Sequence, residues 1–320
     1  MAEIKGAVRS YYDVSDEAMV MIQGNHDDAS TTGLAESGNN DKADYGVFVI
    51  NEDDYMRKQG VGYSEDVTYH EGIVKNTAAN LKTYLDDKLA KSYDKPIFIV
   101  SHLPLHYYRR TSGAGDGQFG GYIFDVINQA GQDGLNIFFI FGHNHTSDYD
   151  DHIGSSSIYL KPGDEISVAK GRYECQSYTL SFVYMNAGYI TSCLATSGVE
   201  TAPSMVVYEI YSDRVEISRY NQNGICEIKA KGIQNDKDSF EINETVYTSP
   251  MVTKLTQFRQ KGWLSDKKIV DSQCVLILQQ HLLNVCEMDS GLVKYADMND
   301  DGAVDSVDLN ILMSVIISAQ

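Results

Sequence analysis

Short apolar runs, separated by polar segments, characterise residues 1–223 of the chain. Three of these runs, at 18–23, 96–100 and 137–141, each lead directly into a loop. Apolar runs of this length predict strands that are buried on both faces. Residues 77–92 carry apolar side chains at helical spacing just before the second run, and they predict an amphipathic helix. The alternation of strand and helix predicts an α/β fold.

Alternating apolar and polar side chains follow the third run, at 177–187, 204–211 and 215–220. A period of two predicts antiparallel strands with one buried face. We expect these strands to complete a second sheet.

Three domains or segments follow from these patterns. Residues 1–223 form the α/β domain. Residues 224–255 are of mixed character with a charge-rich stretch, and we expect a linker there that contains at most one strand. Residues 256–320 form a smaller carboxyl-terminal module.

Each of the three apolar runs is followed by a loop that carries histidine. The loops read Gly24-Asn25-His26-Asp27, Ser101-His102-Leu103-Pro104 and Gly142-His143-Asn144-His145. Loops at the carboxyl ends of strands gather at one edge of an open α/β sheet. Neutral imidazoles are good ligands for zinc and iron. The sequence therefore predicts that the three loops share a metal centre.

In this order and strand context, the three loops resemble the later motifs of the calcineurin-like metallophosphoesterases. The resemblance covers residues 1–222, and it implies a β-sandwich flanked by helices with two divalent transition metals, Zn, Fe or Mn. It also implies hydrolysis of a phosphoester substrate, in which a proton is donated to the departing oxygen. The implied roles are metal binding by Asn25, His102 and His143 at one metal and by His145 at the other, proton donation by His26, and orientation of its ring by Asp27.

The chain also departs from this family. The family begins with Asp-x-His and Gly-Asp-x-x-Asp motifs, and neither is present between Met1 and Gln23. These motifs would supply most ligands of one metal and the carboxylate that bridges the pair. We therefore expect the chain to be the back portion of a longer enzyme, with a sandwich that lacks its first strands. The alternative is a catalytically impaired remnant that acts only as a tethered binding protein. His106, four residues after His102, is interpreted as a residue on the substrate side.

Residues 297–308 place oxygen-bearing groups at the spacing of a calcium-binding loop. Oxygen side chains occupy loop positions 1, 3, 5, 9 and 12, and Gly302 stands at position 6, where such a loop turns sharply. An apolar helical face follows at 309–317. The predicted Ca²⁺ ligands are Asp297, Asn299, Asp301, Ala303, Asp305 and Asp308.

A degraded copy of this unit precedes it. Residues 270–275 align with 304–309, but loop positions 1, 3 and 5 of the copy fall on Trp263, Ser265 and Lys267, which cannot form a calcium cage. Two such loop–helix units over 256–320 resemble a type I dockerin module. The resemblance implies a small all-α calcium-loop domain that binds a cohesin domain of a scaffold protein, as in a cellulosome.

By the same resemblance, Ser306 and Val307 lie at the recognition face for cohesin, and the chain is extracellular. Residues 1–15 are too polar for a signal peptide, so we expect that peptide to precede the missing motifs.

The composition of the chain excludes two classes of binding partner. The net charge of −19 argues against nucleic acid, whose phosphates require Lys and Arg. No apolar run is long enough to span a membrane, so no membrane partner is expected. The five cysteines show no CxxC spacing, and they indicate neither a zinc ribbon nor a disulfide framework.

Overall fold

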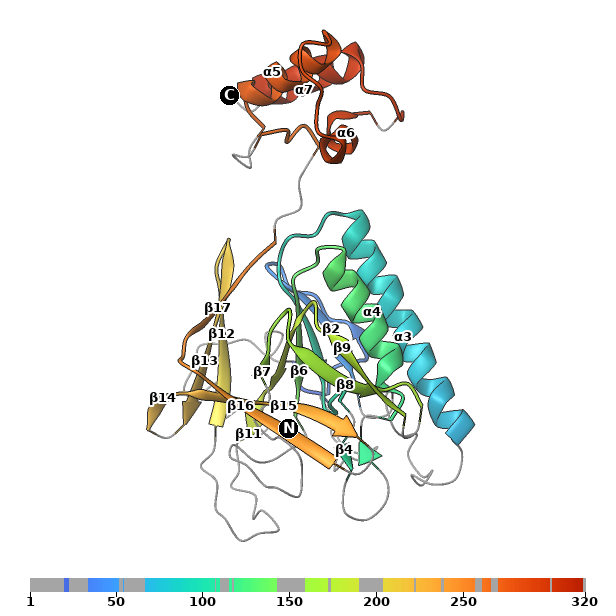
Figure 1. Cartoon of the computed structure of the whole chain (residues 1–320), viewed down its shortest axis with the longest axis vertical. Coiled ribbons are helices and arrows are strands. Elements are labelled where there is room, and N and C mark those ends of the chain that lie inside the picture. Colours follow the sequence, from blue (N-terminus) through green and yellow to red (C-terminus); the bar gives the residue numbers. More distant parts are fainter. Residues whose placement is uncertain are drawn as a thin grey trace. The chain divides into compact units, whose positions relative to one another are not determined.

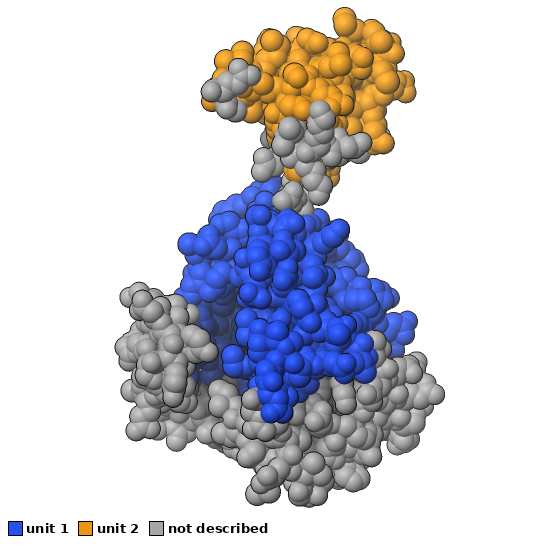
Figure 2. All heavy atoms as spheres, turned by 90° about the vertical axis from the view of Figure 1, so that its left-hand side faces the viewer, with its two compact units in different colours: residues 1–256 blue, residues 257–320 orange. Residues whose placement is uncertain are grey.

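The computed structural model forms two compact units, unit 1 (Met1–Thr256) and unit 2 (Gln257–Gln320), which are coloured separately in Figure 2. The residues that the structure describes are 20–22, 34–51, 54, 67–106, 108–109, 115–116, 118–142, 159–171, 174–189, 204–221, 223–236, 239–256, 261–265, 270–299 and 301–318.

A six-stranded sheet lies at the centre of unit 1 (Figure 1). Its four inner strands are parallel to one another, and the short outer strands are antiparallel to their neighbours. The strands in spatial order are β1 (Gly38–Asn39), β2 (Gly46–Ile50), β3 (Ile97–Ser101), β6 (Ile137–Phe141), β10 (Val183–Asn186) and β7 (Tyr159–Leu160). The predicted apolar runs at 96–100 and 137–141 are thus neighbouring parallel strands.

Two helices, α3 (Val67–Ala90) and α4 (Gly120–Gln132), pack against each other on one side of this sheet (Figure 1). The ring of Tyr84 on α3 lies 5.2 Å from that of Phe48 on β2. The helix predicted at 77–92 is present, but α3 begins at Val67, and its buried face already includes Val74, which has no exposed surface.

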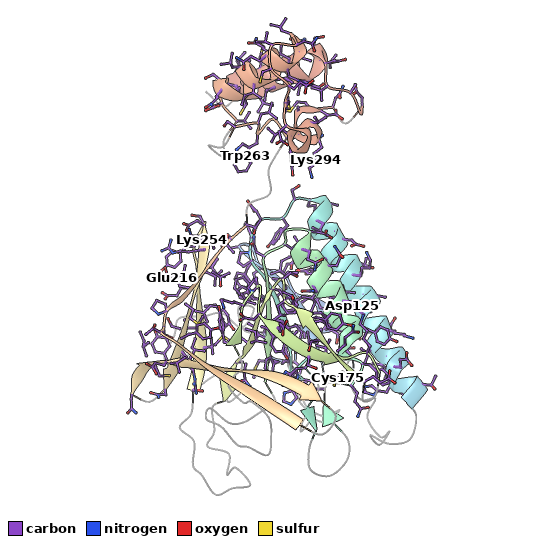
Figure 3. All side chains as sticks on the ribbon, in the orientation of Figure 1. Asp125, Cys175, Glu216, Lys254, Trp263 and Lys294 are labelled. Atoms are coloured by element: carbon purple, nitrogen blue, oxygen red, sulfur yellow. The ribbon has the colours of Figure 1, made fainter. Side chains whose placement is uncertain are left out.

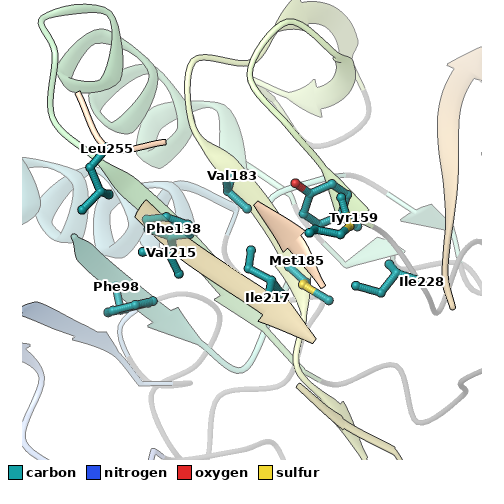
Figure 4. Close-up of a cluster of buried hydrophobic side chains, with 10 residues drawn as sticks. Phe98, Phe138, Tyr159, Val183, Met185, Val215, Ile217, Ile228 and Leu255 are labelled. Carbon is teal, nitrogen blue, oxygen red and sulfur yellow. The ribbon is translucent and has the colours of Figure 1, made fainter. Parts of the chain in front are cut away.

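A second sheet packs against the opposite side. It contains β11 (Gly188–Tyr189), β12 (Ser204–Ile210), β13 (Arg214–Asn221) and β14 (Gly224–Cys226), with β17 (Met251–Lys254) paired to β13. Side chains alternate between the faces of each strand, so Phe98 and Phe138 point away from the helices. They meet Val215 and Ile217 of β13 in a buried apolar cluster between the sheets (Figure 4). Unit 1 is therefore a mixed α/β structure with three layers: the two helices, the six-stranded sheet and the second sheet. That these layers form the metallophosphoesterase sandwich stays a prediction.

The remaining described strands form two-stranded sheets. They are β4 (Tyr108–Arg109) with β5 (Gly115–Asp116), β8 (Glu165–Ala169) with β9 (Cys175–Thr179), and β15 (Ile228–Asp236) with β16 (Ser239–Tyr247).

Three expectations differ from the structure of unit 1. Residues 177–187, expected to be an antiparallel strand of the second sheet, instead contribute to β9 and to β10, which is a parallel strand of the six-stranded sheet. Residues 224–255, expected to be a linker, contain four strands, and Ile228, Met251 and Leu255 belong to the core between the sheets. Their charged side chains concealed this, because a strand of a two-stranded ribbon needs few apolar residues. Residues 20–22, expected to lie in a strand, pair with no strand among the described residues, and the Met21 carbonyl accepts a hydrogen bond from the Ala35 N–H.

Unit 2 contains the helices α5 (Ser272–Leu282), α6 (Ser290–Ala296) and α7 (Ser306–Ser318). Their core consists of Leu264, Cys274, Leu278, Ala296 and Leu312, all of them buried. Whether the module is wholly helical stays a prediction, since residues 257–260, 266–269, 300 and 319–320 lie outside the described part. Among the described helices of both units, none has the length and apolar character needed to cross a membrane.

Candidate metal sites

The four parallel strands of unit 1 end together at one edge of the sheet. The strand register pairs Ile50 with Ser101, Ser101 with Phe141, and Phe141 with Asn186. Because all four strands run in the same direction, the segments that follow them leave from this edge. His102 is the first residue after β3, and Gly142 is the first residue after β6.

His102 lies against the beginning of the segment that follows β6. Its carbonyl oxygen accepts a hydrogen bond of 3.1 Å from the Gly142 N–H. Its ring nitrogen Nδ1 is 3.8 Å from the point that a Cβ on Gly142 would occupy. The half-buried imidazole of His102 is therefore held beside the chain as it enters residues 143–145.

Only one of the four predicted transition-metal ligands can be placed. Asn25, His143 and His145 lie outside the described residues, as do His26 and Asp27. Within the described ranges no three His, Cys, Asp or Glu side chains are grouped so that they could hold a metal ion. The transition-metal centre therefore stays a prediction, with His102 at the expected edge.

The segment that carries His102 is anchored by Tyr184. The Tyr184 hydroxyl accepts hydrogen bonds from the N–H groups of Leu105, at 2.8 Å, and His106, at 3.3 Å, and it lies 2.7 Å from Nδ1 of His106. Nδ1 of His106 and the Tyr184 hydroxyl share a hydrogen bond, in which the donor depends on the tautomer of the ring. Burial raises the pKa of Tyr184 far above its ordinary value, and the hydroxyl stays protonated.

His106 does not lie on the substrate side. Its side chain is 1 % exposed and packs edge-on against Phe141 and Tyr184. The expectation from the sequence was therefore wrong, because spacing along the chain from His102 does not show that the His106 side chain is buried. The sequence analysis did not identify Tyr184, since a strand pattern gives no signal for a buried hydroxyl that accepts hydrogen bonds from a distant loop.

Asn186, the last residue of β10, brings a further polar group to the same edge. Its side chain is 5 % exposed, and its Oδ1 accepts the Gly188 N–H at 2.8 Å. Its Nδ2 is buried and has no hydrogen-bond partner among the described residues. A buried amide without a hydrogen-bond partner destabilises the fold, so Nδ2 of Asn186 could donate a hydrogen bond to a ligand oxygen at this edge.

In unit 2, the loop at 297–308 is folded around its own carboxylates. The two carboxylate oxygens of Asp297 accept the N–H groups of Asp301, at 3.2 Å, and Gly302, at 2.9 Å. The Asp301 side chain accepts the Ala303 N–H at 2.9 Å, which together with the Asn299 amide lowers the pKa of Asp301. Gly302 has φ +86°, the left-handed conformation that favours glycine at the sharp turn.

Asp308 closes this loop from the first turn of α7. It has no exposed surface, and its two oxygens accept the N–H groups of Met298, at 2.7 Å, and Asp305, at 2.8 Å. A fully buried carboxylate is expensive without an opposite charge. The aspartate and asparagine oxygens of the loop are the hard donors that Ca²⁺ prefers, so the residues present fit this ion.

The two predicted recognition residues stand at the start of α7. Asp305 caps the helix by accepting the Val307 N–H at 2.7 Å, and this places Ser306 and Val307 on the surface. Val307 is 47 % exposed. Asn310, Ser314 and Ile317 continue the same exposed face at helical spacing, and the described part of α7 bears its single charge on buried Asp308.

Comparison with known proteins identifies unit 2. Residues 266–316 match the family model of the dockerin type I domain. No curated protein matches the chain significantly. The match covers the calcium loop, α5, α6 and most of α7, and it includes the predicted recognition residues Ser306 and Val307. The chain therefore carries a type I dockerin domain at residues 266–316.

Proposed function

We propose that unit 2 attaches this chain to a scaffold protein by binding a cohesin domain, and that the chain works outside the cell as part of such an assembly. The dockerin match carries the proposal, because dockerin domains bind cohesin domains. The surface of α7 supports it further. An exposed face with apolar side chains and no charge is suited to a desolvated protein interface, where charged groups are depleted.

Binding of the full chain to a purified type I cohesin, measured by calorimetry with and without calcium, tests this. We expect binding that is lost in EDTA. Val307→Asp should weaken it at least tenfold, because a buried charge at the interface would be unpaired. Val285→Asp makes the same change at another exposed valine, in the segment after α5, and is the control that should bind normally. Equal losses in both variants, or binding that ignores calcium, would contradict the proposal.

For unit 1 we propose metal-dependent hydrolysis of phosphoric esters. The supporting observation is that β3 and β6 are adjacent and end in register, so that His102 lies beside Gly142, which directly precedes His143 in the sequence. With Asn25, these residues would hold divalent Zn, Fe or Mn. Such metals supply charge stabilisation and an activated nucleophile to phosphoryl transfer.

The remaining roles come from the resemblance of the three loops to the metallophosphoesterases. His26 would donate a proton to the departing oxygen, and Asp27 would orient its ring. The competing proposal is a catalytically impaired remnant that acts only as a binding protein tethered through its dockerin domain.

Metal content and turnover distinguish the two. We would count bound transition metal per chain and assay p-nitrophenyl phosphate and its bis-ester. If unit 1 is an enzyme, His102→Ala should lose metal and activity, whereas His70→Ala, which removes a histidine of α3 packed against Phe119, should retain both. A chain that binds no transition metal and hydrolyses neither ester is the tethered remnant.

A further inference from the structure

The two halves of unit 2 repeat one hydrogen bond at a spacing of 34 residues. In the second half, the Met298 N–H donates to Asp308 at 2.7 Å. In the first half, the Leu264 N–H donates to the Cys274 Sγ at 3.4 Å. Cys274 and Asp308 are both without exposed surface. The thiol of Cys274 therefore occupies the place of the carboxylate that closes the calcium loop.

The surroundings of these two side chains repeat as well. Asp271 caps α5 by accepting the Gln273 N–H at 2.9 Å, just as Asp305 caps α7 through the Val307 N–H. One turn after Cys274 and Asp308, respectively, Leu278 and Leu312 are fully buried in the same core. The first half thus keeps the fold of a loop that closes onto a helix.

Its donor chemistry is different. The positions of Asp297 and Asn299 in the calcium loop are taken by Trp263 and Ser265, which are 7 % and 3 % exposed (Figure 3 labels Trp263). Ca²⁺ requires six to eight oxygen ligands, and a thiol is a soft ligand that it does not select.

The sequence of the loop points the same way. Lys267 and Lys268 stand where the second half has Asp301 and Gly302. Lysine brings positive charge toward the place of a cation, and it lacks the conformational freedom that lets Gly302 adopt φ +86°. A calcium ion therefore does not fit the first loop.

We propose that the dockerin domain of this chain binds a single Ca²⁺, in the loop 297–308, and that its first half is a metal-free structural copy. In this copy, burial of Trp263 and Leu264 and the hydrogen bond to the Cys274 thiol take over the role of the cation. This inference does not depend on cohesin binding or on phosphoesterase activity.

Native mass spectrometry of the full chain, stripped with EDTA and then titrated with calcium, tests it. We expect one bound Ca²⁺ per chain. Asp297→Asn removes a charge from the second loop and should reduce the count to zero. Asp271→Asn is the matched change in the first loop, where asparagine preserves the helix cap, and it should leave the count at one.

Two calcium ions in the unaltered chain, or one ion retained by Asp297→Asn, would overturn the proposal. A loss of calcium in Asp271→Asn but not in Asp297→Asn would do the same. Cys274→Asp supplies the missing carboxylate and provides a second test: it should still bind one ion, because Trp263, Ser265 and Lys267 remain. A second ion bound by this variant would show that the first loop still holds a usable site.

Discussion

The hydroxyl of Tyr184 lies 2.7 Å from Nδ1 of His106, and it joins the segment after β3 to β10, which is separated from β3 by β6 in the sheet. The two aromatic groups fix one end of the segment that begins at His102. The other end is held by the hydrogen bond between the Gly142 N–H and the His102 carbonyl.

Tyr184→Phe should destabilise unit 1 by about 1–3 kcal/mol, the cost of leaving buried hydrogen-bonding groups without a partner. The substitution removes the oxygen that accepts the Leu105 and His106 N–H groups, while the ring continues to stack on Phe141. Urea unfolding, followed by near-ultraviolet circular dichroism, measures the free energy of unfolding.

Tyr178→Phe is the control for this change, because its hydroxyl donates to the exposed side chain of Gln176 and should be worth less than about 0.5 kcal/mol. If the two variants lose equal stability, the Tyr184 hydroxyl does not anchor the loop.

Stability should fall in acid through Asp41. Burial alone would raise the pKa of this carboxyl, but hydrogen bonds from Lys88, Tyr84 and the Val47 N–H outweigh burial and lower the pKa below the usual 3.8. A carboxyl whose pKa is lower in the folded state stabilises the fold above its unfolded pKa, and the contribution disappears as the pH falls through the folded pKa. The stability difference between the unaltered chain and Asp41→Asn should therefore shrink from about pH 5 downward.

Urea titrations at a series of pH values measure this difference. Asp86→Asn is the control, because Asp86 pairs with Lys82 on the exposed surface of α3, where an ion pair contributes little. A difference between Asp41→Asn and the unaltered chain that stays constant from pH 7 to about pH 3 would contradict the assignment.

The sequence was most informative where side chains are buried on both faces of a strand. The run at 137–141 could be recognised because Phe138 faces the second sheet while Phe139 is buried on the other face, and both positions must then be apolar. The calcium loop could be recognised for a similar reason, since each oxygen ligand has its own position in a short local segment.

Features that depend on contacts between residues far apart in the chain could not be predicted from the sequence. Met251 and Leu255 belong to the core only because β17 pairs with β13, a relation that no local pattern encodes. Tyr184 and Asn186 lie on β10, a strand that is buried on both faces, and the sequence does not show which groups their polar atoms contact. Cys274 became informative only when its hydrogen bond could be compared with that of Asp308.

Gly188→Ala should be strongly destabilising. Gly188 has φ +85°, and a Cβ there would approach the Ser204 carbonyl oxygen to 2.4 Å, so the backbone pairing of β11 with β12 would have to shift. Gly163→Ala introduces the same backbone strain at φ +95° into open space, and should cost only about 1–2 kcal/mol. Thermal unfolding measures the stability of both variants. Gly188→Ala introduces a steric clash and backbone strain, whereas Gly163→Ala introduces the strain alone. A smaller loss of stability in Gly188→Ala than in Gly163→Ala would contradict the predicted clash.

Calcium should stabilise unit 2 by mass action, because the buried Asp308 carboxylate and the loop oxygens bind the ion only when they are folded together. At a free calcium concentration one hundred times the dissociation constant, the expected gain is about 2.7 kcal/mol, and it should grow with the logarithm of the concentration. Scanning calorimetry of the full chain should show one transition that moves upward with calcium and another, from unit 1, that calcium leaves in place. In Asp308→Asn the first transition should begin lower and no longer respond. A response that persists in this variant would mean that the stabilising ion binds elsewhere.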